Sequence, residues 1–262
     1  MSPIGLFRTS LAKKFVMAIT GLILVGFVLG HMLGNLQVFG PPEAINKYAY
    51  FLHHILPWEV LWVVRIVLLV AVVLHIVSAV LLVIENRKAR PETYEDQQLI
   101  QASFAARTMK YSGLIVLAFI IFHLLHFTVQ SIDPAFRNLR FDIDGKDSQD
   151  AYAMIVLGFS NVGVSAFYIL AMALLCWHLS HGVSSMFQSL GFRNEIWRTR
   201  LNRFALAFGL LIFAGFAIIP ITSLISWYGG PDIVYASEIR QATENWDGET
   251  PIYVSYPESA KH

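Results

Sequence analysis

The sequence has almost no cysteine, since Cys176 is the single one among 262 residues. One thiol cannot form a disulfide within the chain, and an iron–sulfur cluster is held by several cysteine ligands. A disulfide framework and a Cys-ligated iron–sulfur cluster within this chain are therefore excluded.

Charge is also scarce. Charged residues make up 14% of the chain and hydrophobic residues 56%, and the mean hydropathy is +0.56. Soluble domains carry roughly a quarter charged residues. The charges here gather in short clusters with long apolar runs between them, which is typical of a polytopic membrane protein. Because the first apolar run is too long for the core of a signal peptide, we expect no cleavable signal peptide.

Five apolar segments are long enough to cross a bilayer of ~30 Å as helices. They cover residues 15–38, 61–84, 111–131, 161–187 and 203–228. Helices are expected because a bilayer leaves backbone groups without outside partners, and no segment alternates like a barrel strand. The sequence thus predicts an all-α, five-helix transmembrane domain over residues 1–228, followed by a polar tail over 229–262.

Lysine and arginine in the short loops predict the orientation of these helices. Twelve basic residues fall on one side: Arg8, Lys13, Lys14, Arg87, Lys88, Arg90, Arg107, Lys110, Arg193, Arg198, Arg200 and Arg203. The N-terminus is therefore expected in the cytoplasm and the C-terminus outside. We expect the tail to be loosely ordered, with a partner contact as the alternative. The loop 132–152 is expected outside, with its DIDGKD stretch as a solvated turn rather than a calcium loop.

Histidines are the unusual feature of the apolar segments. Six of the nine histidines lie inside them: His31, His75, His123, His126, His178 and His181. Ionisable residues at membrane depth are costly and indicate function. A single one could serve only as a hydrogen bond between helices, but here each of the first four helices carries at least one. Imidazole is a common axial ligand of haem, and a helix bundle can hold such sites in its core.

The direction of the helices decides which histidines can pair. On the predicted orientation, His31 and the 123/126 pair fall in the outer half of the membrane. His75 and the 178/181 pair fall in the inner half. The sequence therefore predicts an outer haem between His31 and His123 or His126, and an inner haem between His75 and His178 or His181.

Several neighbours are candidates for contacts with haem or quinone. Gly30, with Gly26 and Gly34, lines one side of the first helix, which fits either a groove for a flat macrocycle or close helix packing. Arg65 could pair with a propionate of the outer haem or anchor the helix at the interface. Arg107, Lys110 and Arg203 have the same two interpretations for the inner haem. The polar and aromatic cluster of His53, His54, Trp58 and Glu59 could form a quinone site or an interfacial belt.

Four stretches resemble a known family. They are KKFVMAITGLILVGFVLGHMLGNLQVF (13–39), VVRIVLLVAVVLH (63–75), IIFHLLHFTV (120–129) and WHLSHGVSSMFQSLG (177–191). The last contains H-x-x-x-G-x-x-S followed by a further glycine, as His178, Gly182, Ser185 and Gly191. The chain thus resembles the di-haem cytochrome b membrane-anchor subunit of succinate:quinone oxidoreductase, that is, succinate dehydrogenase or fumarate reductase, over nearly all but its tail.

The resemblance implies a function in electron transport. It implies a multi-pass subunit of the bacterial cytoplasmic (inner) membrane that carries two b haems and anchors two cytoplasmic partners. One would be a flavoprotein with FAD and the other an iron–sulfur protein. Electrons would pass between succinate or fumarate and membrane quinone, and no nucleic-acid partner is expected. An oligomer of the whole complex is left open, as are the quinone type and the direction of the reaction.

The resemblance also implies the ligands His31, His75, His123 and His178. Counting depth from the charged residue at each cytoplasmic helix end slightly favours His126 and His181, but helix tilt absorbs that difference. We therefore expect His126 and His181 to lie next to the ligands, against a neighbouring helix, a propionate or quinone. Cys176 stands where some fumarate-reducing relatives have a glutamate for a proton relay, so that relay is not implied.

Two other functions compete with this interpretation. The chain could be the cytochrome b subunit of another quinone-linked enzyme, such as a hydrogenase or formate dehydrogenase. It could instead be a proton-coupled transporter lined by histidines, which predicts carboxylates or arginines inside the helices. These helices have almost none.

Overall fold

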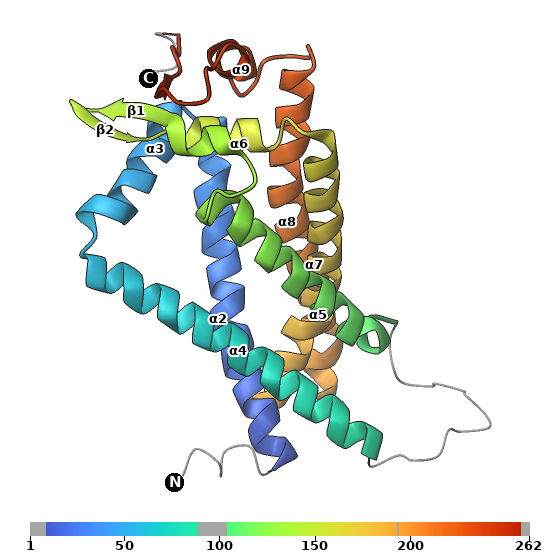
Figure 1. Ribbon diagram of the computed structural model, residues 1–262. Coiled ribbons are helices and arrows are strands. Elements are labelled where there is room, and N and C mark those ends of the chain that lie inside the picture. The colour runs from blue at the N-terminus through green and yellow to red at the C-terminus, as the bar shows by residue number, and fades with distance from the viewer. Residues whose placement is uncertain (1–8, 89–103, 193, 258–262) are drawn as a thin grey trace. The chain divides into compact units, whose positions relative to one another are not determined.

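The computed structural model describes residues 9–88, 104–192 and 194–257. Five of its helices are long and apolar enough to cross a membrane, as predicted. They are α2 (Ser10–Asn35), α4 (Trp58–Lys88), α5 (Phe104–His123), α7 (Val162–Ser189) and α8 (Glu195–Trp227). A 3-10 turn, η1 (Leu36–Phe39), extends α2, and a π turn, η3 (Leu124–Thr128), extends α5. By length and composition this is a multi-pass membrane protein (Figure 1).

The chain divides into two compact units, each built from parts of the same long helices. The first unit comprises residues 1–29, 62–112 and 176–210, and the second comprises 30–61, 113–175 and 211–262. His75 and His178 belong to the first unit, whereas His31 and His123 belong to the second. Each predicted pair is therefore contained in one unit.

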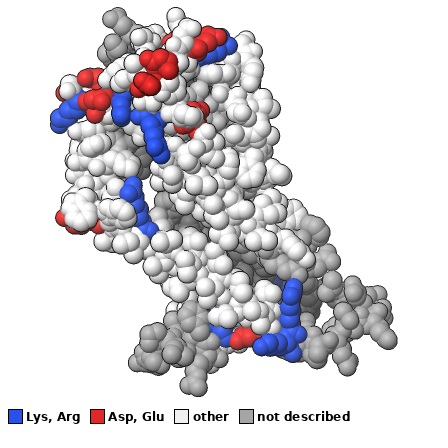
Figure 2. All heavy atoms as spheres, viewed as in Figure 1, with Lys and Arg blue, Asp and Glu red and all other residues white. Residues whose placement is uncertain are grey.

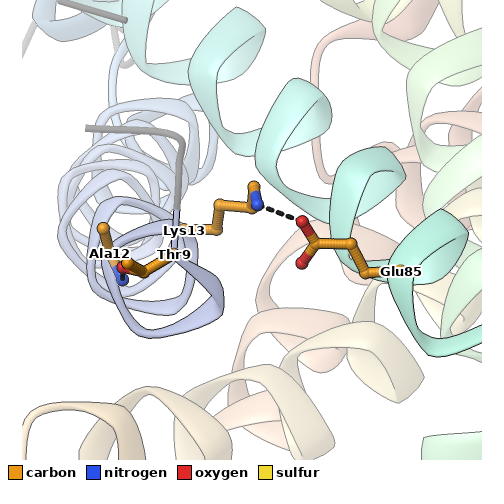
Figure 3. Close-up of polar contacts among 4 residues, drawn as sticks. All are labelled: Thr9, Ala12, Lys13 and Glu85. Carbon is orange, nitrogen blue, oxygen red and sulfur yellow. Dashed lines mark hydrogen bonds and ion pairs between the residues drawn. The ribbon is translucent and has the colours of Figure 1, made fainter. Parts of the chain in front are cut away.

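Within the first unit, an ion pair joins α2 to α4 near their ends. Lys13 Nζ contacts a carboxylate oxygen of Glu85, and the Lys13 side chain is almost fully buried (Figure 3). Close by, the Thr9 hydroxyl accepts a hydrogen bond of 3.2 Å from the amide of Ala12 and so caps the start of α2. Lys13 thus has a partner in the protein as well as its expected role as an interfacial cation.

Helices α7 and α8 approach closely at Gly209. A Cβ built at this position would lie 2.8 Å from the backbone oxygen of Cys176. Glycine is therefore required here, because a backbone carbonyl cannot rotate away as a side chain can.

We expect Gly209→Ala to lower the free energy of unfolding by about 1–3 kcal/mol, since α7 and α8 must move apart. Thermal unfolding of the detergent-solubilised protein measures the loss. Gly215→Ala on the same helix is the matched control, because the added methyl meets only the flexible side chain of Met32. Equal losses for the two variants would contradict this account.

The second unit contains a small sheet. Strand β1 (Leu139–Ile143) pairs antiparallel with β2 (Lys146–Gln149) and parallel with β3 (Ile252–Tyr253). Asp144 and Gly145 join β1 to β2 with φ values of 53° and 77°, as a two-residue hairpin turn of type I′ requires. Asp144 and Gly145 thus form an exposed turn, as predicted for the DIDGKD stretch, but its other residues belong to the two strands of a hairpin and Ile143 is buried.

Short helices cover this sheet and form a core that we call the cap. It combines α3 (Pro42–Tyr50), the 3-10 turn η4 (Pro134–Asn138), α6 (Ala151–Gly158), α9 (Ala236–Glu244) and the three strands. Its most buried side chains include Phe136, Leu139, Tyr152 and Val156. On the face shown in Figure 2, acidic and basic side chains gather over the cap segments, while the long helices are mostly uncharged.

The described part of the tail belongs to the cap, so the expectation of a loosely ordered tail is wrong. Val234, Ile239 and Ile252 are buried, at 1%, 0% and 4% exposure. In α9, Ile239 faces the core while Ser237 and Arg240 face outward, which is the pattern of an amphipathic helix. The average polarity of the tail concealed these few apolar residues.

A buried polar network joins three segments of the cap. Asp150, fully buried before α6, accepts hydrogen bonds from Asn46 Nδ2 at 3.0 Å, the Ala153 amide at 2.9 Å and the Tyr256 hydroxyl at 2.8 Å. Asn46 Oδ1 in turn accepts the amide of Tyr152 at 3.1 Å. Asp150 is therefore both the N-cap of α6 and the link between α3 and the tail.

Candidate functional site

The histidine rings of the second unit meet as one pair. His31 of α2 and His123 of α5 have ring centroids 5.7 Å apart, with ring planes at 79°. The ring of Phe216 lies 5.9 Å from that of His31, and the ring of Phe119 lies 5.8 Å from that of His123. Aromatic side chains thus surround two imidazoles that face each other.

The first unit contains a second pair of the same kind. His75 of α4 and His178 of α7 have ring centroids 6.5 Å apart, with ring planes at 62°. Metal–imidazole bonds are about 2.0 Å long, so two imidazoles on opposite sides of one metal ion have ring centres roughly 6 Å apart. Both pairs fit that spacing. Among the described residues no three His, Cys, Asp or Glu side chains come together, so each pair offers two ligands.

Hydrogen bonds fix which nitrogen of His75 carries the proton. Its Nδ1 lies 3.2 Å from the backbone oxygen of Met17 and 3.3 Å from the hydroxyl of Thr20. A carbonyl can only accept, and the Thr20 hydroxyl already donates to the backbone oxygen of Val16 at 2.8 Å. Nδ1 must therefore be the donor, which leaves the Nε2 lone pair free for a metal.

His178 is held in the same way. Its Nδ1 lies 3.3 Å from the hydroxyl of Ser112, and that hydroxyl donates to the backbone oxygen of Met109 at 3.1 Å. The Ser112 oxygen therefore accepts from Nδ1–H, and Nε2 of His178 is again the free nitrogen. The two rings of the first unit share one tautomer, the one that an Nε2 ligand needs.

The second unit has a tyrosine in the place of these two hydroxyls. Tyr168 of α7 is 5% exposed, and its hydroxyl lies 3.3 Å from Nδ1 of His123 and 3.0 Å from Nδ1 of His126. His31 is contacted instead by Asn35, whose side-chain nitrogen lies 3.3 Å from Nε2 and 3.4 Å from Nδ1. One hydroxyl thus connects the two histidines of the FHLLHF stretch.

The structure places His126 beside this pair. It is 2% exposed, and its ring packs on Phe127 and Phe136 with centroid distances of 4.2 and 5.3 Å. It lies in the π turn η3, where the Val129 amide bonds to the backbone oxygen of Leu124 at 2.7 Å. Single π turns inside helices often occur at functional sites. The ring that meets His31 is that of His123.

The predicted glycine groove has mixed support. A Cβ built at Gly26 or Gly30 would meet no atom of the described residues within 4 Å, whereas one at Gly34 would touch Tyr48. Among the described residues, Gly30 therefore does not serve to let two helices pack closely. Gly21 lies beside His75, where a Cβ would be in ordinary van der Waals contact with Cε1 at 3.5 Å, so glycine is not required there.

The predicted cationic contacts stay predictions. Arg65 is exposed and its guanidinium carbon lies 5.4 Å from the centroid of the Trp62 ring, which suits an interfacial anchor. Arg203 is exposed as well. The side chains of Arg107 and Lys110 lie outside the described part of the structure, as do Arg8, Arg90 and Arg193 entirely.

The predicted quinone cluster lies at the start of α4 and in the π turn before it, η2 (Phe51–Ile55). His53, His54, Trp58 and Glu59 are all exposed. The His54 ring stacks on Tyr50, with centroids 4.5 Å apart and planes at 15°. Both earlier interpretations, a quinone contact and an interfacial belt, remain predictions.

Sequence reasoning missed the polar residues around the histidines. Thr20, Ser112 and Tyr168 occur as isolated hydroxyls in apolar runs, where burial without a partner is unfavourable. Tyr168 was the most visible of these, because a buried tyrosine hydroxyl usually has a hydrogen-bond partner. The need of the Tyr168 hydroxyl for a partner could have indicated that a histidine lies beside Tyr168.

Comparisons with known proteins add no relative. No protein-family model matches the chain, and neither a curated protein nor a solved structure matches it. A function must therefore be argued from the paired histidines and from the motifs of the sequence.

Proposed function

We propose that the chain is the membrane-anchor cytochrome b subunit of a succinate:quinone oxidoreductase and binds two b haems. The observation that carries this proposal is the arrangement of four histidines as two facing pairs. In one pair, both rings also have their Nδ1 proton engaged. If His75 and His178 served only as hydrogen bonds between helices, there would be no reason for Nε2 to be free in both rings.

The chain's own residues would bind and orient the cofactor. His31 with His123, and His75 with His178, would each hold one haem iron through imidazole nitrogens. Hydrogen bonds at Nδ1 would hold three of these rings and so fix their planes. The partners are Thr20 and Met17 for His75, Ser112 for His178, and Tyr168 for His123. A haem held by two histidines supplies reversible one-electron transfer. The apolar side chains around each pair would exclude water and thereby influence the reduction potential.

The remaining parts of the proposal follow from the resemblance and the loop charges. The cytoplasmic partners would be a flavoprotein with FAD and an iron–sulfur protein, and quinone would be the substrate in the membrane. The N-terminus would face the cytoplasm of a bacterial cell, and the histidine pair His31–His123 would lie nearer the outside. The basic loops would then face the partners. The positive-inside rule by itself also predicts basic loops on the cytoplasmic side.

A spectrum tests the haem part of the proposal directly. We expect the detergent-solubilised, dithionite-reduced protein to show a b-type α-band, and haem extraction to give about two haems per chain, because there are two ligand pairs. Absence of haem absorbance from a folded preparation would contradict the proposal and favour a histidine-lined transporter.

Succinate separates the two cytochrome hypotheses. In membranes that contain the whole complex, we expect succinate or a reduced quinone to reduce the same α-band, and FAD to co-purify with the chain. A haem protein that succinate and fumarate leave unaffected, but that hydrogen or formate reduces, would be the alternative cytochrome b subunit.

A further inference from the structure

Tyr168 is the residue whose surroundings carry an inference beyond the haem ligands. Its ring is held edge-on by Phe119 and Phe159, with centroid distances of 5.1 and 4.9 Å and planes at 85° and 83°. These contacts fix where the hydroxyl lies. It is therefore positioned by packing and not only by the two histidines that it contacts.

The hydroxyl has one proton and two histidine neighbours. It can donate to one Nδ1 and accept from the other. O–H···N bonds are ordinarily shorter than N–H···O bonds, and the distance to His126 is 3.0 Å while that to His123 is 3.3 Å. The assignment that fits is donation from Tyr168 to His126 Nδ1 and donation from His123 Nδ1–H to Tyr168.

The first unit contains the same tautomer that this assignment gives to His123. There a backbone carbonyl beside His75, and a serine already committed as donor beside His178, require the same Nδ1–H tautomer. With Tyr168 as acceptor, His123 takes that tautomer too, and its Nε2 is free. His126, as acceptor at Nδ1, cannot present that nitrogen as a ligand while the bond exists.

We propose that Tyr168 is the positioning residue of the His31–His123 pair, and that His126 acts through Tyr168 rather than on the haem iron. This inference rests on the proposed function. Tyr168 would accept from Nδ1–H of His123, fix its tautomer and ring plane, and make the ring a stronger ligand. His126 would orient the tyrosine hydroxyl so that an oxygen lone pair faces His123.

The test compares Tyr168→Phe with the wild-type protein, both purified with haem. The substitution keeps the ring and removes the hydroxyl. Loss of such a partner typically weakens metal binding 10–100-fold. If the ferric form alone loses tenfold in affinity, the potential of that haem rises by about 59 mV. A redox titration followed at the α-band, with the low-spin electron paramagnetic resonance signals, measures the change.

Two internal controls make the result specific. The haem of the His75–His178 pair is present in the same molecules and is expected to keep its potential and signal. Tyr152→Phe removes another buried tyrosine hydroxyl, which has no hydrogen-bond partner among the described residues. It is expected to leave both haems unchanged. His126→Ala is expected to keep both haems and to shift the same haem as Tyr168→Phe, by a smaller amount.

Each outcome decides between clear alternatives. A change or loss confined to the haem of the His31–His123 pair supports the positioning role. No change, or an equal change in both haems, overturns it while leaving the proposed function intact. A folded wild-type protein without haem overturns the proposed function itself, before any variant is compared.

Discussion

If the chain binds two haems as proposed, replacing His123 by alanine is expected to reduce the haem content from two to one per chain. His123 and His31 are the two rings that face each other in the second unit, with centroids 5.7 Å apart. An alanine at position 123 removes the ligand opposite His31. Among the described residues no third His, Cys, Asp or Glu side chain joins the pair to take the place of His123. The haem that remains should be the one held by His75 and His178.

The matched variant is His126→Ala, three residues along the same stretch. It removes an imidazole that is fully buried, whereas His123 is half-buried, and that lies against Tyr168, Phe127 and Phe136. We expect this variant to keep both haems. Haem extraction gives the stoichiometry, and the reduced spectrum shows which α-band component is lost.

The first unit offers the same comparison with a second pair of variants. His178→Ala is expected to lose the other haem, because His178 faces His75 at 6.5 Å. His181→Ala is expected to keep it. If His126→Ala or His181→Ala lost a haem while its partner variant kept both, the ligand assignment of that pair would be wrong.

The sequence predicted the parts of this site that depend on hydropathy and residue type. Five apolar runs of sufficient length can only be helices in a bilayer, and the described part of the chain contains five such helices. Histidines are rare in such runs, so the candidates were visible by inspection. The alternation of helix direction then restricted the pairs, and the structure brings His31 to His123 and His75 to His178.

The choice within each histidine pair could not be made in this way. His123 and His126 lie about one turn apart, so any regular helix presents both to similar neighbours. The π turn at Leu124–Thr128 changes that register locally, and in it His126 packs against Phe136 and Tyr168. Such packing joins residues far apart in the chain, which no periodicity in a single segment reports.

The cap was missed for a related reason. Its core takes Tyr152, Ala153, Ile155 and Val156 from α6, and only one or two apolar residues from segments such as α3, with Ile45, and α9, with Ala236 and Ile239. Apart from α6, which is apolar throughout but has only 8 residues, the described cap segments have no apolar run that predicts an element from hydropathy. The short segments bury enough apolar surface to be ordered only when they pack together. Considered by itself, the tail was therefore expected to be loosely ordered.

The second large effect is expected in this cap, for Asp150→Ala. The substitution leaves two buried donors, Asn46 Nδ2 and the Ala153 amide, and the partly buried Tyr256 hydroxyl without an acceptor. An unsatisfied buried donor costs about 1–3 kcal/mol. Removing the buried carboxyl also removes its own desolvation cost, which offsets part of this loss. We expect a net loss of roughly 2–5 kcal/mol for the cap.

Local protection measures this loss better than global unfolding. Because the network ties α3 and Tyr256 to α6, its loss should open the tail while the long helices stay folded. Hydrogen exchange of the α9 amides and limited proteolysis of residues 229–257 report on that opening. Asp150→Asn is the control, since an amide keeps one acceptor oxygen at nearly the same volume. Unchanged protection in the alanine variant would contradict the assigned role.

The same carboxyl makes a prediction for pH. Burial raises the pKa of Asp150 above its usual range, and the hydrogen bonds from Ala153, Asn46 and Tyr256 offset only part of that rise. A folded state that holds its proton more tightly than the unfolded state is stabilised most below the unfolded pKa, about 3.9. As pH rises through the raised folded pKa, this contribution is lost. Protection of α9 should therefore fall with rising pH above about 4 in the wild-type protein.

The comparison with Asp150→Asn isolates this titration from the others in the cap. Tyr256 does not interfere, because burial raises its own pKa well above the usual value and it remains a donor throughout. Asp247 accepts hydrogen bonds from the amides of Thr250 and Glu249, which lower its pKa, and it is present in both proteins, so its contribution cancels. The difference in α9 protection between wild type and variant should thus change in favour of the variant as pH rises. A difference that stayed constant from acid to neutral pH would mean that Asp150 keeps an ordinary pKa in the folded cap.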